Sequence, residues 1–65
     1  MTMLEYCKMI LEKVSFDKSL FRAEYLKAIT KLLREEIQDL KNWCIEKFGQ
    51  TYCEEAAPGF FLPGA

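Results

Sequence analysis

The residues best suited to chemistry in this chain are its three cysteines, Cys7, Cys44 and Cys53. A thiol can act as a nucleophile, a metal ligand or a redox group, but each role needs suitable neighbours. Histidine is absent, so no Cys–His or Ser–His pair can form and the commonest acid–base group at neutral pH is missing. Three widely spaced thiols also fall short of the four ligands of a structural zinc site. We therefore expect no enzymatic activity, no metal and no cofactor.

The three thiols are expected to differ in their surroundings. Cys7 and Cys44 fall at apolar positions of helical patterns, where a thiol packs as a small hydrophobic side chain. Cys53 follows the last regular pattern, so we expect it to be more exposed and to be the thiol open to oxidation or crosslinking. The odd number of cysteines and the lack of a secretory pattern at the N-terminus favour free thiols in a reducing, cytoplasmic location.

Adjacent carboxylates occur at Glu35–Glu36 and Glu54–Glu55, but neighbouring residues on a helix point about 100° apart and do not converge on a substrate. We interpret both pairs as solvated. Three isolated glycines cannot form a phosphate-binding loop. No segment approaches the roughly 20 apolar residues needed to cross a bilayer, so we expect no membrane partner.

A basic ridge of Lys27, Lys31 and Arg34 recurs on one side of the second expected helix and is the candidate nucleic-acid-binding surface. Glu24 lies on the same ridge, and no aromatic side chains interleave with its charges. The formal net charge is −1, so no global field attracts nucleic acid. A solvated helix face is favoured, and a small nucleic-acid-binding regulator stays as the alternative function.

These residues are positioned by an expected all-α domain of three helices, over residues 3–15, 18–33 and 35–48. Apolar residues recur at three- and four-residue steps, which is typical of amphipathic helices that pack together. The inward-facing positions are Leu4, Cys7, Leu11 and Val14 in the first helix, Phe21, Tyr25, Ala28, Ile29 and Leu32 in the second, and Leu33, Ile37, Leu40, Cys44 and Phe48 in the third. Met3, Tyr6, Met9 and Ile10 widen the first stripe, so that helix is expected to touch more than one neighbour.

Capping residues predict where these helices begin. Thr2, followed three residues later by Glu5, fits a capping box for the first helix. Asp17 is the expected N-cap of the second helix, with Phe16 packing back onto Phe21 as a hydrophobic staple.

The second and third helices are expected to separate near Arg34, because the apolar stripe changes phase there. A continuous helix would place Glu36 in the middle of the apolar stripe, whereas a break places Glu35 and Glu36 in a first helical turn. Gly49 should end the third helix and the helical domain of residues 1–49, since glycine suits a left-handed C-cap.

Residues 50–65 contain two Pro-Gly elements, and we expect an extended or partly disordered tail there. Phe60, Phe61 and Leu62 are costly to leave in water, so they should pack onto a helical surface, such as that of a neighbouring subunit. Trp43 and Ile45 lie off the apolar seam of the third helix, and one three-helix chain cannot easily bury both. These five residues are the predicted interface.

The segments LEYCKMILEKVSFDKSLF (residues 4–21) and EEIQDLKNWCIEKFG (residues 35–49) resemble short helical proteins encoded in bacterial genomes that have no assigned activity. The resemblance covers residues 4–49 and implies no functional residue. The apolar excess of so short a chain favours a structural or protein–protein interaction module that forms a helical homo-oligomer or binds a helical partner.

Overall fold

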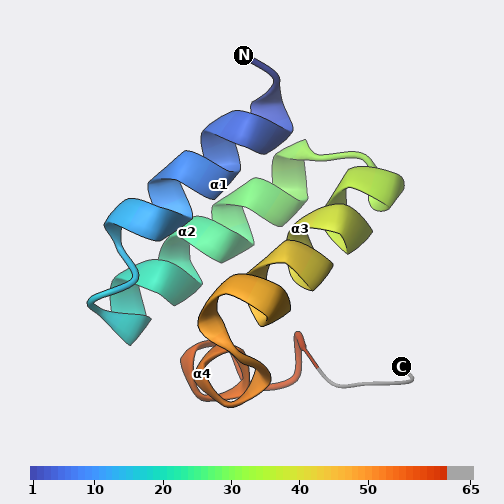
Figure 1. The fold of residues 1–65 in the computed structure, drawn as a ribbon. Coiled ribbons are helices and arrows are strands. Elements are labelled where there is room, and N and C mark those ends of the chain that lie inside the picture. The colour runs from blue at the N-terminus through green and yellow to red at the C-terminus, as the bar shows by residue number, and fades with distance from the viewer. Residues whose placement is uncertain (62–65) are drawn as a thin grey trace.

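The computed structural model describes residues 1–61, and its regular structure over this range is helical: α1 (Met3–Lys13), α2 (Lys18–Lys31), α3 (Arg34–Phe48) and α4 (Gln50–Ala56). The first three helices lie side by side and alternate in direction, and α4 lies across one end, where it is seen nearly along its axis (Figure 1). Both α1 and α4 contact α3, and both also contact α2. The all-α prediction is confirmed, whereas the count of three helices is replaced by four.

The fourth helix corrects the expectation of an extended tail from residue 50. Gly49, with φ 91° and ψ 149°, bends the chain between α3 and α4. Its N–H donates to the Ile45 carbonyl at 2.9 Å, and its carbonyl accepts from the Cys53 N–H at 3.1 Å. Because α4 has only seven residues, its stability comes mainly from packing rather than from intrinsic helix propensity. The composition of the segment therefore did not indicate it.

Both predicted N-caps are confirmed, although the described residues show only the threonine half of the capping box predicted at Thr2 and Glu5. The Thr2 hydroxyl accepts from the Glu5 N–H at 3.1 Å, and the Asp17 carboxylate accepts from the N–H groups of Ser19 and Leu20 at 2.9 and 3.3 Å. These contacts satisfy N–H groups that the first helical turn leaves without partners.

The staple between Phe16 and Phe21 is wrong. Phe16 is 81% exposed in the turn between α1 and α2, while Phe21 is fully buried. The ring of Phe21 packs instead against Phe48 and Tyr52, with centroids 5.4 and 5.3 Å away. Side chains from α3 and α4 therefore fill the space that the staple was expected to occupy.

The predicted break between the second and third helices is confirmed. Leu32 and Leu33 have extended backbones, and the Glu36 carboxylate accepts from the Leu33 N–H at 3.0 Å. Leu33, predicted to face inward, is instead 68% exposed. It is the N-cap of α3 and lies outside the helix, so the helical phase does not determine where its side chain points.

One cluster of buried side chains joins all four helices. Phe61, after α4, is fully buried, and its ring centroid lies 4.7 Å from that of Tyr25 on α2. The buried residues are Cys7, Leu11, Phe21, Tyr25, Ala28, Leu32, Leu40, Cys44, Cys53, Ala56, Ala57 and Phe61. The last four come from the segment expected to be a tail, so the core depends on a part of the chain that the sequence left outside it.

Most of the predicted inward positions are confirmed as core or as partly buried residues packed against it. The partly buried ones are Leu4, Val14, Ile29, Ile37 and Phe48. None of the helices in residues 1–61 is long and apolar enough to span a membrane.

Candidate interaction surface

Large apolar side chains stay at the surface of the described chain, and α1 carries two of them near its start. Met3 and Tyr6 are each 47% exposed. The full set of exposed large apolar residues is Met1, Met3, Tyr6, Phe16, Leu20, Leu33 and Phe60. The core of this chain thus leaves part of the apolar side of α1 uncovered.

A cleft of about 190 Å³ lies between α1 and α2 beside these side chains. Its lining consists of Met3, Tyr6, Cys7 and Ile10 from α1 and Glu24, Lys27, Ala28 and Lys31 from α2. On both helices these positions recur every three or four residues, so each lining follows one helix face. The cleft therefore forms where the lining face of α1 lies beside the lining face of α2.

The two sides of the cleft differ in character. The α1 side is apolar and includes the buried Cys7, and the buried Ala28 of α2 lies on the opposite side. The α2 side carries charge, and the Glu24 carboxylate there lies 3.4 Å from the Lys27 ammonium. An apolar centre with a charged rim is the usual composition of a protein–protein interface.

The predicted interface residues Trp43 and Ile45 are both half-buried and pack against the core of their own chain. The Trp43 ring lies edge-on to Phe48, with centroids 5.6 Å apart, and the Lys8 ammonium lies 5.7 Å from its centre. The expectation that one chain could not accommodate both rested on three helices. The structure adds a fourth, whose residues extend the core that α3 packs against.

The predicted tail residues separate into two groups. Phe61 is fully buried in its own chain, whereas Phe60 is 38% exposed, with its ring 6.2 Å from Tyr25. Phe61 therefore packs onto a helical surface, as expected for the tail, and that surface belongs to the same chain. Leu62, the third residue of the group, lies outside the described residues.

The basic ridge does not lie on one helix. Lys27 and Lys31 belong to α2 and line the cleft, whereas Arg34 is the first residue of α3, beyond the break. Lys27 also has Glu24 as an ion-pair partner. The ridge is therefore interrupted by a change of helix and by a carboxylate.

All three thiols are free and buried, so the expectation of an exposed Cys53 is wrong. Desolvation by burial raises the pKa of Cys44 to about 12, helped by neighbouring Cys53, and raises the pKa of Cys53 itself to about 11, helped by Glu54. Burial also raises the pKa of Cys7. Helix α4 turns Cys53 inward, and a buried neutral thiol is a poor nucleophile.

These raised pKa values predict a loss of stability at alkaline pH. Burial also raises the pKa of Tyr25 to about 12. In the unfolded chain these groups have their ordinary pKa values, 9.0 for Cys44 and 10.0 for Tyr25, so above pH 9 it binds fewer protons than the native chain. The free energy of unfolding should therefore fall between pH 9 and about 12 by up to about 1.4 kcal/mol per pH unit for each titrating group. Urea titrations across this range measure the loss, and constant stability would contradict neutral burial of these groups.

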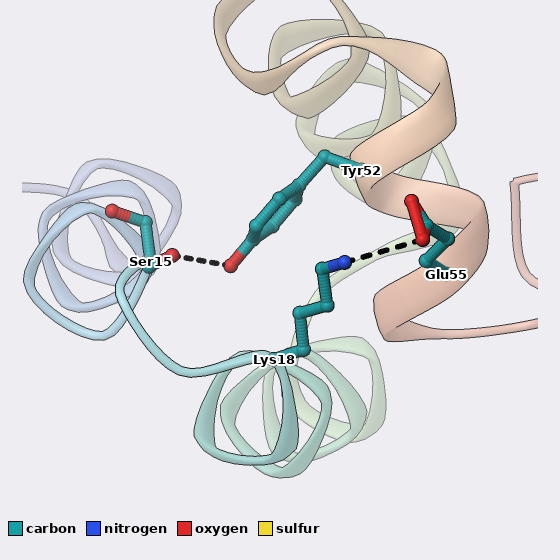
Figure 2. Close-up of polar contacts among 4 residues, drawn as sticks. All are labelled: Ser15, Lys18, Tyr52 and Glu55. Carbon is teal, nitrogen blue, oxygen red and sulfur yellow. Dashed lines mark hydrogen bonds and ion pairs between the residues drawn. The ribbon is translucent and has the colours of Figure 1, made fainter.

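Two polar contacts hold α4 against the turn between α1 and α2 and against the first residue of α2 (Figure 2). The Tyr52 hydroxyl donates to the Ser15 carbonyl, and the Lys18 ammonium lies 3.3 Å from the Glu55 carboxylate. Both partners of the ion pair are about half exposed, so its contribution is at most about 1 kcal/mol. Tyr52 is not among the residues that the sequence pattern predicts to be functional. Its only signal is the spacing of Tyr52, Cys53 and Ala56, which is one short helical stripe.

Within residues 1–61, the structure shows no group of three or more Cys, Asp or Glu side chains arranged to hold a metal ion. Comparison with known proteins adds no functional assignment: no family model, curated protein or solved structure matches the chain.

Proposed function

We propose that this chain is a small structural or protein–protein interaction module that self-associates through an apolar helix face, the α1 side of the α1–α2 cleft. The observation that carries the proposal is the half-exposure of Met3 and Tyr6 beside that cleft. These two side chains have no place in the core of their own chain, although the core is otherwise closed by α4 and Phe61.

The occupant we propose for the cleft is a second copy of the chain. One face holds both the protruding apolar side chains and the cleft that can accept them, which is the self-complementarity required by a two-fold dimer. The rim of this face also carries both signs of charge, Glu24 and Lys31, so a rotated copy can place unlike charges opposite each other. Two half-exposed side chains contribute on the order of 1 kcal/mol each, which favours a weak dimer that depends on concentration.

Replacing Tyr6 with lysine tests this face. We expect the dissociation constant of the dimer to rise about tenfold or more, because the substitution removes an apolar ring and adds a charge at the proposed contact. Tyr6 is half-exposed, so the monomer should keep its fold, as circular dichroism can verify.

The matched control is Phe16→Lys, an equal change of chemistry in the turn at the other end of α1, where the ring is more exposed. Sedimentation equilibrium should show wild-type association for this variant. If Phe16→Lys loses association and Tyr6→Lys does not, the dimer contact does not lie at the α1–α2 cleft and the proposal is wrong.

The nucleic-acid alternative receives less support from the described residues. Its three basic residues are divided between two helices, and Lys27 is partly neutralised by Glu24. If the ridge did bind phosphate, changing Lys27, Lys31 and Arg34 to glutamine would reduce the log–log salt slope by roughly three. We expect the wild-type chain and this variant to show the same salt dependence in any binding to nucleic acid.

A further inference from the structure

A single residue, Gly49, joins α3 to α4, and its backbone conformation is restricted to glycine. Its φ of 91° and ψ of 149° lie in a region that side chains with a Cβ atom avoid. A Cβ added at Gly49 would meet no atom within 4 Å. Substitution would therefore act on the backbone bend itself and not on packing.

The segment beyond this bend, residues 50–61, forms an arm that docks on remote parts of the chain. The arm supplies Cys53, Ala56, Ala57 and Phe61 to the core. Its polar contacts, from Tyr52 to Ser15 and from Glu55 to Lys18, each join residues 37 positions apart (Figure 2). The slot that receives the arm is thus built from α2 and the turn before it, and also from α3, whose Phe48 ring lies 5.8 Å from that of Tyr52.

We propose that this arm is exchangeable: released at Gly49, it docks in the same slot of a second copy, and the two copies form a reciprocally swapped dimer. The exchange goes beyond the proposed function, because it uses the α2–α4 slot and leaves the α1–α2 cleft untouched. The contacts of the arm with α2 and with the turn before it are the same in the closed monomer and in the swapped dimer. The backbone at Gly49 differs, which is the general basis of domain swapping.

The sequence around the hinge permits an open form, and Gly49 sets its balance with the closed monomer. No proline lies between Lys18 and Ala57, and α3 ends and α4 begins within one residue of Gly49. If Gly49 adopted helical angles, α3 and α4 would continue as one helix and carry the arm away from its own slot. Glycine opposes that helix and permits the bend, so this one residue favours the closed monomer.

Replacing Gly49 with alanine tests the exchange, because alanine is strained in the bend and favours a continuous helix. We expect the dimerisation constant of Gly49→Ala to rise about tenfold or more, with helical circular dichroism retained. The matched control is Gly59→Ala. Gly59 has a φ of 89°, and a Cβ there also meets nothing within 4 Å, but it does not join two helices. The control should lose stability without gaining dimer.

Adding Tyr6→Lys to Gly49→Ala separates this proposal from the previous one. A swapped dimer should persist in the double variant and dissociate slowly, because separation requires the arms to undock. A dimer that Tyr6→Lys abolishes, or a Gly49→Ala chain that associates no more tightly than the wild type, would overturn the exchange without affecting the α1–α2 face.

Wild-type protein provides the second measurement if Gly49→Ala does not fold. Labelled and unlabelled wild-type chains are unfolded and refolded together at millimolar concentration, and a second sample is mixed without unfolding. The refolded sample should contain more mixed dimer, and this dimer should persist longer after dilution. If refolding gives no more mixed dimer than simple mixing, the arm does not exchange.

Discussion

Replacing Phe61 with alanine is expected to lower the free energy of unfolding by about 3–5 kcal/mol. The ring is fully buried and lies 4.7 Å from that of Tyr25, so its loss leaves a cavity where the C-terminal arm meets α2. A cost of this size is a large part of the total stability of a short domain. Urea unfolding followed by circular dichroism measures it.

The neighbouring residue supplies the control. Phe60→Ala removes the same atoms from a ring that is 38% exposed, so we expect a loss of about 1 kcal/mol or less. Similar losses for the two variants would mean that the arm does not dock as described. In that case the amides of residues 50–61 should also exchange hydrogen as fast as those of an unstructured chain.

Phe21→Ala is expected to be at least as damaging, because its ring links three helices. Phe21 on α2 packs edge-on against Phe48 of α3 and against Tyr52 of α4, and it stacks beside Tyr25. Removing a fully buried phenyl ring costs about 3–5 kcal/mol, and aromatic pairs add about 0.5–1.5 kcal/mol each. The variant should be largely unfolded at moderate temperature.

Thermal melting monitored by circular dichroism measures this loss, with Phe16→Ala as the matched control. Phe16 is the exposed ring that sequence reasoning paired with Phe21, so its removal should change the free energy of unfolding by less than about 0.5 kcal/mol. A melting temperature lowered by Phe16→Ala as much as by Phe21→Ala would restore the staple and contradict the observed packing.

The parts of the fold that could be predicted are those set by local chemistry. Thr2 and Asp17 cap helices through hydrogen bonds to N–H groups two or three residues away, so three- to four-residue patterns reveal them. The phase change near Arg34 likewise reports a break directly, because a helix cannot keep Glu36 on its buried face at no cost.

The unpredicted parts depend on contacts between distant residues. Helix α4 is too short to show a clear period, and its packing on α2 joins positions 37 apart. Missing it led to the wrong expectation of an exposed Cys53. The exposed staple residue Phe16 has the same origin, since Tyr52 of α4 packs on Phe21.

The candidate interaction surface was only partly indicated by sequence. The spacing of Met3, Tyr6 and Ile10 predicts that they widen the apolar stripe of the first helix beyond one partner, and the structure shows that they line the cleft. What the pattern could not show is that no further helix of the described chain covers Met3 and Tyr6. That depends on where α3 and α4 lie, which is a property of the whole fold.

The most direct test of the central claim is sedimentation of the unmodified chain from micromolar to millimolar concentration, combined with thermal melting at each concentration. Self-association predicts a weight-average mass that rises above that of the monomer and a melting temperature that rises with it, because a dimer of native chains stabilises the native state. A chain that stays a folded monomer across this range, with a constant melting temperature, would contradict the proposed function.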